Sequence, residues 1–261
     1  MDNTKILQII ERDPSYIKMI ENPTEEMLKL AVSKNGIMIK YFNNPPSDIK
    51  WEALKSNVWA IEYIDEPEEE MCIYVVEKAW NAIKFIKNPS EAVLEKAVAI
   101  KGWAIQYIDN PSEKLQSIAV NKDWDSIQYI KNPSEEIQLL AVSKYFAAIK
   151  YINGPSLTVQ KAAILKNAEA VLYIKTIDEQ TKLIFINDNI DVVKYIKDID
   201  LNKVQEILKE KLKDEALDKE YIIKFINCDS LTINKVKFIY NYGSREAKKI
   251  LVDYKLSSFN Q

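Results

Sequence analysis

Prolines recur at a fixed step of 22 residues along much of this chain. Of its nine prolines, only Pro14 and Pro46 fall outside the series. The seven in phase are Pro23, Pro45, Pro67, Pro89, Pro111, Pro133 and Pro155. A repeat of this length is the signature of a solenoid, in which each unit buries its apolar face against its neighbours. Nine units can be phased over residues 1–198, and residues 199–261 follow as a divergent segment.

Apolar columns keep the same step, and we expect them to form the core. A small pair such as Ala97-Val98 stands at the centre of each unit, between Ile9-Ile10 and Phe185-Ile186. A pair such as Tyr107-Ile108 closes each unit. The aliphatic column between these pairs is Ile17, Ile39, Ile61, Ile83, Ile105, Ile127, Ile149, Val171 and Val193.

Each unit reads as two short helices. Proline disfavours the α region for the residue before it, here Asn132, and Ser134 can cap a helix whose first turn carries two acids. Apolar residues at helical spacing continue to about Lys144, and a second helix of about two turns follows over 146–152. The sequence therefore predicts an all-α protein, an α-solenoid of two-helix units with a divergent helical cap over 199–261.

A leucine-rich-repeat-like horseshoe is the alternative fold. Ile127, Tyr129 and Asn132 match the L-x-L-x-x-N core of that repeat. That repeat needs an apolar residue two places after the asparagine, where this chain has Ser134. We therefore rank the horseshoe second.

The segment Ala97-Val98-Ala99-Ile100-Lys101-Gly102-Trp103-Ala104-Ile105-Gln106-Tyr107 resembles a known motif. It is similar to the A-V-x-x-N-G-x-A-L-x-Y core of the bacterial and viral helical repeat called domain of unknown function 4116. Lys101 replaces the asparagine of that motif, which Asn35, Asn57 and Asn167 keep in other units. The resemblance implies a helical-repeat fold and a bacterial, phage or large-virus source, and it supplies no activity.

Composition excludes several classes of chemistry. The chain has no histidine, which excludes Ser-His and Cys-His catalysis and imidazole metal ligation. Its four glycines are dispersed, so the sequence has no G-x-G-x-x-G motif or P-loop. Cys72 and Cys228 stand alone, and we interpret both as small buried hydrophobes. We assign no catalytic, metal or cofactor residues, and we expect a cytoplasmic protein without a signal peptide or membrane span.

Aromatic residues follow the first helix of five consecutive units. Exposed rings could anchor a partner or stack on a nucleotide, whereas buried rings would form inter-repeat packing, which we favour. Trp59 and Trp103 share one position of the repeat, while Trp80 and Trp124 precede it by one, so the four rings cannot share one kind of pocket. Because Asp123 and Asp125 flank it, we expect Trp124 to be the most exposed. The candidate residues are Trp59, Trp80, Trp103, Trp124 and Tyr145, with Lys101, Lys122 and Lys144 near the same edge.

Charge is nearly balanced over the whole chain, at a formal net charge of −3. Neither half is basic enough for the phosphate footprint of a nucleic-acid polymer binder. One dense acidic patch could meet a basic partner or a magnesium ion, although blocks of like charge usually form solvated turns, which is the interpretation we prefer. Its members are Glu62, Asp65, Glu66, Glu68, Glu69 and Glu70.

The repeat breaks after residue 198. Residues 201–217 form a charged amphipathic stretch, and shorter helices are expected over 221–226 and 236–240. Terminal repeats of solenoids are atypical because one face meets water, so we interpret this segment as a cap and not as a docking helix.

Three functional hypotheses follow. The first is a non-enzymatic protein that presents an extended surface to a protein partner, such as a host or defence protein if the gene comes from a phage. The second is a small-ligand receptor or sponge for a signalling nucleotide, which would stack between the rings while lysines meet its phosphates. The third is a carboxylate enzyme, with or without magnesium, but nothing in the sequence marks a catalytic pair.

Overall fold

The structure is a computed structural model that describes residues 2–259, with side chains to residue 257. It contains only helices and turns within this range, so the horseshoe alternative, which requires a parallel sheet, is wrong. Nine α-helices each precede a short 3-10 helix: α1 (Asn3–Arg12), η1 (Pro14–Met19), α2 (Glu25–Lys34), η2 (Gly36–Tyr41), α3 (Ser47–Ser56), η3 (Val58–Tyr63), α4 (Glu69–Lys78), η4 (Trp80–Phe85), α5 (Glu91–Ile100), η5 (Gly102–Tyr107), α6 (Glu113–Lys122), η6 (Trp124–Tyr129), α7 (Glu135–Lys144), η7 (Phe146–Tyr151), α8 (Leu157–Lys166), η8 (Ala168–Tyr173), α9 (Glu179–Asp188) and η9 (Ile190–Lys194). Four α-helices follow: α10 (Leu201–Leu212), α11 (Lys219–Ile226), α12 (Lys235–Tyr242) and α13 (Arg245–Phe259).

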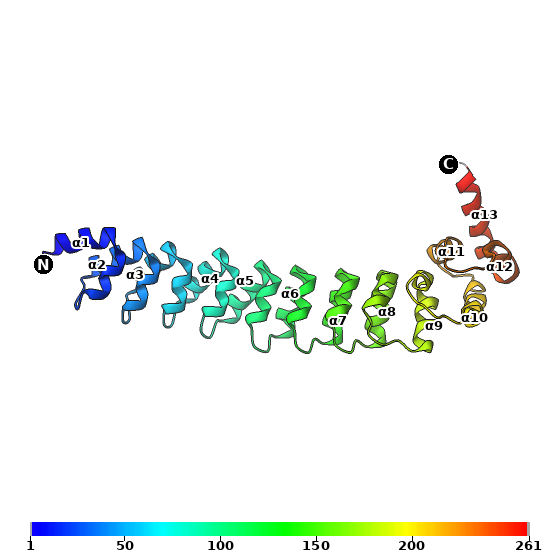
Figure 1. The fold of residues 1–261 in the computed structure, drawn as a ribbon, viewed down its shortest axis with the longest axis horizontal. Coiled ribbons are helices and arrows are strands. Elements are labelled where there is room, and N and C mark those ends of the chain that lie inside the picture. Colours follow the sequence, from blue (N-terminus) through cyan, green and yellow to red (C-terminus); the bar gives the residue numbers. More distant parts are fainter. Residues whose placement is uncertain (1, 260–261) are drawn as a thin grey trace. The chain divides into compact units, whose positions relative to one another are not determined.

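The fold is the predicted α-solenoid, with one refinement. The second helix of each repeat is a 3-10 helix of five or six residues, not an α-helix. A 3-10 helix rises about 2.0 Å per residue, compared with about 1.5 Å in an α-helix, so a few residues suffice to connect one α-helix to the next turn. Within each unit, the α-helices of successive repeats lie side by side in sequence order (Figure 1).

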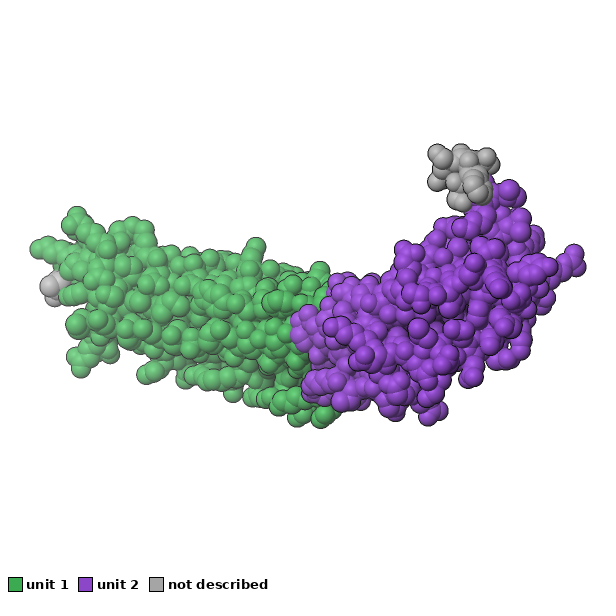
Figure 2. Space-filling view, turned by 45° about the vertical axis from the view of Figure 1, so that its right-hand side comes forward, with its two compact units in different colours: residues 1–132 green, residues 133–261 purple. Residues whose placement is uncertain are grey.

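The chain consists of two compact units (Figure 2). Unit 1 ends at Asn132 and contains the six repeats from α1 to η6. Unit 2 begins at Pro133 and contains three repeats, from α7 to η9, and the helices α10 to α13. The boundary between the units therefore lies within the repeat array.

Helices α5, α6 and α7 begin at the predicted serine caps, whereas α3 and α4 begin without a side-chain cap. The Ser90 hydroxyl accepts a hydrogen bond from the Val93 amide, and Ser112 and Ser134 cap the next two helices in the same way. The capping serines also join neighbouring repeats, because the Ser112 hydroxyl donates to Glu91 in the previous helix. A helix cap contributes about 1 kcal/mol, so the serine column supports both the start of each helix and the stacking.

A single residue ends the α-helix and begins the 3-10 helix. The backbone amide of Asn57 donates to the Ala53 carbonyl, while its side-chain oxygen accepts from the Trp59 amide at 3.0 Å. Asn35 and Asn167 repeat this double cap. The asparagine of the repeat motif thus has a structural role, because it satisfies backbone groups that both helix ends leave unpaired.

The residue before the phased proline enters the left-handed region in five of the seven repeats that have one, at Asn44, Glu66, Asn88, Asn110 and Gly154, but not at Asn22 or Asn132. Its φ is 51° at Asn88, 48° at Glu66 and 59° at Gly154. Asparagine and glycine tolerate this conformation best, which explains why they dominate the position. A glutamine in the following helix secures some of these turns, since Gln116 donates to the Pro111 carbonyl at 2.9 Å.

The core consists of the predicted columns. The central pair is fully buried in every repeat from Ala31-Val32 to Phe185-Ile186, and the aliphatic column from Ile17 to Val193 is buried throughout. Small alanines at the centre of the α-helices allow neighbouring helices to approach closely. The sequence therefore identified the core correctly.

Two glycines mark an especially close approach of neighbouring repeats. A Cβ atom at Gly36 would lie 2.2 Å from the Ala53 carbonyl oxygen of the next helix, and one at Gly102 would lie 2.4 Å from the Ala119 oxygen. The first position of the 3-10 helix therefore faces the next repeat. Trp80 and Trp124 occupy this position in their repeats.

The C-terminal helices only partly match the prediction. Helix α10 ends at Leu212, short of residue 217, because a turn begins at Lys213. It packs on α9 with Val204, Leu208 and Leu212 buried. Helices α11 and α12 occur where shorter helices were expected, whereas α13 was not predicted.

Candidate functional site

The 3-10 helices bury their middle and expose their end. In η5, Ala104 and Ile105 are buried, while Gln106 and Tyr107 face solvent. The last position of each 3-10 helix therefore forms a surface column, which is aromatic in most repeats. In unit 1 this column is Met19, Tyr41, Tyr63, Phe85, Tyr107 and Tyr129. Tyr41, Tyr63 and Tyr107 are 45%, 40% and 39% exposed.

Ring contacts connect this column to the predicted tryptophans. Trp59 packs edge-on against Phe85 in the next repeat, with ring centroids 5.9 Å apart. Trp103 meets Tyr129 in the same manner at 6.0 Å. Together these rings form what we call the aromatic ladder of unit 1, which consists of Tyr41, Trp59, Tyr63, Trp80, Phe85, Trp103, Tyr107 and Tyr129.

Lysines lie over the rings of the ladder. The Lys40 ammonium is 4.9 Å from the centre of the Tyr41 ring, and the Lys84 ammonium is 4.7 Å from the centre of the Phe85 ring. These are cation–π distances, and the attraction is about 0.5–1 kcal/mol at an exposed site. The ladder thus presents aromatic faces and positive charge together.

Lysines on the α-helices of unit 1 have different partners. Lys29 pairs with Asp48 at 3.1 Å, and Lys96 pairs with Glu77 at 2.5 Å. Both join neighbouring α-helices, so their charges are already neutralised within the unit. The contrast distinguishes the 3-10 surface of unit 1 from its α surface.

The structure places the five predicted rings at two depths. Trp59 is the most exposed tryptophan at 36%, and Trp80, Trp103 and Trp124 are half-buried. The prediction that Trp124 would be the most exposed is wrong. Trp124 occupies the first position of its 3-10 helix, where a side chain points at a neighbouring repeat, and Trp59 occupies the second.

The acids flanking Trp124 face the preceding repeat. Asp125 accepts a 2.7 Å hydrogen bond from the indole nitrogen of Trp103. Asp123 accepts from the Gly102 amide at 2.8 Å and pairs with Lys101 at 3.1 Å. Both carboxylates therefore stabilise inter-repeat contacts and do not draw the Trp124 ring into water.

The three predicted lysines are not equivalent. Lys101 is held between Asp123 and the Trp103 ring, 4.8 Å from its centre, so its charge is already balanced. Lys122 and Lys144 end α6 and α7 and are exposed. Lys101 therefore differs from the other two lysines, because its charge is already balanced by Asp123.

Unit 2 continues the aromatic pattern. Tyr145 is 42% exposed, and its ring lies 4.8 Å from that of Phe146. Phe146 is buried and contacts Tyr173 of the next repeat at 6.3 Å. The predicted stripe is thus partly exposed and partly core in this unit as well.

The acidic patch is a set of exposed side chains on a turn and a helix start. Asp65 and Glu66 line an open groove of about 880 Å³ in which Lys50 and Lys87 also lie. Lys87 pairs with Asp65 at 3.0 Å, and Ser47 donates to Glu68 at 2.7 Å. Glu69 accepts from the Ser90 hydroxyl, and Glu62 and Glu70 are exposed. Within residues 2–259, no group of three or more carboxylates or thiols is close enough to hold a metal ion.

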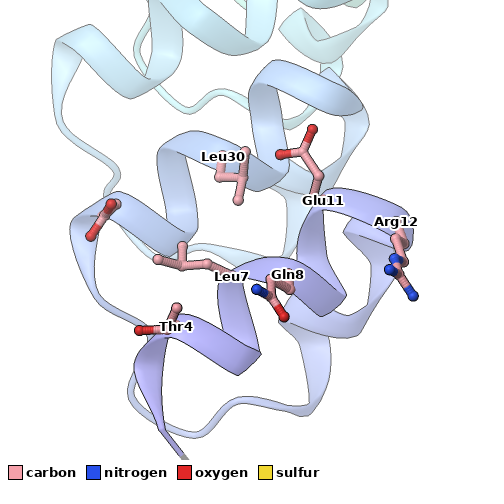
Figure 3. Close-up of a pocket in the computed structure, with 7 residues that line it drawn as sticks. Thr4, Leu7, Gln8, Glu11, Arg12 and Leu30 are labelled. Atoms are coloured by element: carbon pink, nitrogen blue, oxygen red, sulfur yellow. The ribbon is translucent and has the colours of Figure 1, made fainter.

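A second groove lies between α1 and α2 (Figure 3). Its volume is about 580 Å³, and Leu7 and Leu30 face the space between the two helices. Glu11 and Arg12 stand at its rim, and Glu11 pairs with Lys34. The lining contains no paired acid and base that could carry out catalysis.

Both cysteines are buried, as predicted. Burial raises the pKa of the Cys72 thiol to about 11, and the nearby Glu69 carboxylate adds to the shift. Burial also raises the pKa of Cys228. Reactive thiols have lowered pKa values, so neither cysteine has the properties of a nucleophile.

The tyrosine column was not predicted to form a surface. Tyr107 was grouped with Ile108 as a closing apolar pair, whereas the ring is 39% exposed and its neighbour is half-buried. A usable signal was present, because a polar or charged residue precedes the ring in most repeats. Tyrosine also outnumbers phenylalanine in the column, which is typical of rings that have one face in water.

Comparisons with protein-family models, curated proteins and solved structures find no match to this chain. No helix within residues 2–259 combines the length and the apolarity that crossing a bilayer requires.

Proposed function

We propose that this chain is a non-enzymatic helical-repeat protein that binds another protein through the aromatic ladder of unit 1. The observation that carries the proposal is the exposure of Tyr41, Trp59, Tyr63 and Tyr107 on the 3-10 helices of the second, third and fifth repeats. The buried apolar columns of the repeats stabilise the fold, and these four exposed rings lie outside that core. Contiguous exposed aromatic surface is typical of interaction sites.

The chemistry of the ladder fits protein recognition. Tyrosine and tryptophan dominate interface hot spots because they bury a large area while losing little side-chain entropy. Ring-to-ring contacts such as Trp59 with Phe85 hold the surface in place before binding, which lowers the entropic cost of association.

A nucleotide-binding role has weaker support. Trp103 donates its indole N–H to Asp125 and packs edge-on against Tyr129, so its faces are partly occupied. Asp123 neutralises the nearby Lys101. A phosphate placed there would meet two carboxylates.

The resemblance to the domain of unknown function 4116 is part of the same proposal. It suggests that the partner belongs to a bacterial cell, or to the host cell if the gene is viral, where a defence protein is one class of target. A cytoplasmic location goes with this proposal.

Site-specific photo-crosslinking tests the proposed surface. A benzoylphenylalanine residue replaces Tyr63 or Tyr107 in the full chain, and a matched control replaces Lys96 on the α surface. In lysate of the source cell or its host, we expect a specific crosslinked protein from the two ladder positions and none from the control. Crosslinking at Lys96 alone, or at no position, would refute the proposal.

A further inference from the structure

Glycine directly follows two asparagines of this chain, Asn35 and Asn153. Asparagine is a thermolabile residue, because the backbone nitrogen of the next residue can attack its side-chain amide. Glycine favours this attack, since it has no side chain to hinder the approach and its backbone adopts many conformations. An asparagine before proline, such as Asn88, cannot react in this way, because proline has no backbone N–H. The two Asn-Gly pairs are therefore the places in the sequence where the reaction is least hindered.

The pair at Asn153 lies in the exposed turn between η7 and α8. Both Asn153 and Gly154 face solvent. Gly154 has a φ of 59°, and a Cβ atom on it would meet nothing within 4 Å. Within the described residues, the Gly154 amide has no hydrogen-bond acceptor and the Asn153 side chain has no partner. The Gly154 nitrogen and the Asn153 side chain are therefore free to move toward each other.

The pair at Asn35 is held on both sides. The Asn35 side-chain oxygen accepts a 3.1 Å hydrogen bond from the Ile37 amide, and the Gly36 amide donates to the Ser56 hydroxyl at 3.2 Å. Gly36 is buried, and its Cβ position lies 2.2 Å from the Ala53 carbonyl oxygen. An attack by the Gly36 nitrogen would break both hydrogen bonds and move the backbone against the next repeat.

We propose that Asn153 is a site of spontaneous deamidation, whereas folding protects Asn35. Hydroxide or water removes the proton of the Gly154 amide, and its nitrogen forms a bond to the Asn153 Cγ atom. The bond from Cγ to the side-chain nitrogen breaks, and that nitrogen leaves as ammonia. The five-membered succinimide ring then takes up one water molecule at either of its two carbonyl groups. The products are aspartate and isoaspartate, and water is the reactant that the steps consume.

The repeat accommodates aspartate at this position. Asp65 and Asp109 occupy the equivalent position of other repeats, and Asp65 is exposed there and pairs with Lys87 at 3.0 Å. Isoaspartate is different, because it adds one carbon atom to the main chain. The turn it lengthens leads directly to Ser156, whose hydroxyl caps α8 by accepting from the Val159 amide at 3.3 Å. We therefore expect isoaspartate, and not aspartate, to loosen the start of α8.

This inference is independent of the proposed function, because Asn153 belongs to unit 2 and the aromatic ladder to unit 1. Each reaction at Asn153 replaces a neutral amide with a carboxylate. The formal net charge of the chain, −3, becomes more negative by one. An aged preparation of the protein should accordingly contain an additional, more acidic species.

Incubation in heavy-oxygen water followed by peptide mapping in ordinary water tests the inference on the full-length protein. One sample stays folded at pH 8, and the other is unfolded in guanidinium chloride, which gives the intrinsic rate at each asparagine. We expect Asn153 to gain one heavy oxygen atom and to give separate aspartate and isoaspartate peptides. The ratio of conversion at Asn153 to that at Asn35 should be at least about tenfold larger in the folded sample, because Asn35 reacts only after local opening.

Two variants identify the reacting groups. Gly154→Asn copies the Asn43-Asn44 pair of the second repeat, where Asn44 has a left-handed φ of 46°. It should slow conversion at Asn153 about tenfold through steric hindrance and leave Asn35 unchanged. Asn153→Asp supplies the aspartate product directly, and it should keep the circular dichroism spectrum and the Tm of the original protein.

The same ratio of conversion in the folded and unfolded samples overturns the inference. So does a folded sample in which Asn153 stays intact over a time that converts both asparagines in guanidinium chloride. An unchanged rate in Gly154→Asn overturns the assignment of the Gly154 nitrogen as the attacking group. A lower Tm of Asn153→Asp overturns the conclusion that the repeat accommodates a carboxylate at this position.

Discussion

Ser126 interrupts a column of buried alanines, and we predict that replacing it with alanine stabilises the protein. The equivalent position of other repeats is Ala60, Ala82, Ala104 and Ala148, each fully buried. Ser126 is also fully buried, and its hydroxyl has no hydrogen-bond partner in the structure. A buried hydroxyl without a partner costs about 1–3 kcal/mol in proteins.

The size of the effect follows from what the substitution changes. Ser126→Ala removes one oxygen atom and leaves the methyl group that neighbouring repeats already accommodate, so the packing term is small. We therefore expect the free energy of unfolding to rise by about 1 kcal/mol. The reverse change, Ala104→Ser, adds an unpaired hydroxyl at an equivalent site and should lower it by a similar amount.

Urea denaturation followed by circular dichroism measures the change. Because repeat proteins can unfold in parts, hydrogen exchange of the η6 amides provides a local measure of the same quantity. Ser112→Ala is a useful control, since it removes a helix cap and should destabilise by about 1 kcal/mol. A loss of stability in Ser126→Ala would refute the reasoning and indicate that a buried water satisfies the hydroxyl.

Three further predictions concern the backbone and the buried thiol. Gly102→Ala should lower the free energy of unfolding by about 1–3 kcal/mol in urea denaturation, because its Cβ would lie 2.4 Å from the Ala119 oxygen. Gly154→Ala, which meets no atom within 4 Å, should cost only about 1 kcal/mol for its left-handed φ, and equal losses would contradict the close approach. Glu66→Asn should raise thermal stability by about 0.5–1 kcal/mol, because asparagine tolerates the left-handed φ of 48° better; no change in Tm would count against strain there. Cys72 should resist iodoacetamide at pH 8 in mass spectrometry until the protein unfolds, since burial raises its pKa to about 11, and rapid native labelling would contradict this.

The repeat made most of the fold predictable. Ser134 was identified as a cap from its place after a proline and before two acids, and the structure has it capping α7. Such features are local, because a cap depends on residues within one turn of it. The core pairs could be predicted in the same way, because an apolar pair that recurs in every unit, such as Ala97-Val98, is expected to be buried.

The candidate site was less predictable, because exposure depends on contacts between repeats. Trp124 and Trp59 differ by one position of the repeat, and Trp59 is 36% exposed whereas Trp124 is half-buried, although Trp59 also contacts Phe85 of the next repeat. Asp125 looked like a sign of exposure, but it bonds to Trp103, 22 residues earlier. Sequence patterns do not reveal such pairings until the direction of each side chain is known. Helix α13 lies outside the repeat, so no column predicted it.

The short 3-10 helix links the architecture to the proposed function. An α-helix of ten residues, such as α5, packs on its neighbours through the buried residues Val93, Ala97 and Val98. In η5 only Gly102, Ala104 and Ile105 are buried, and Tyr107 contacts Trp80 of the preceding repeat, with ring centroids 6.4 Å apart. Because Tyr107 is 39% exposed despite this contact, packing alone does not explain the recurrence of rings at that position. Binding of a partner along the ladder would provide an explanation.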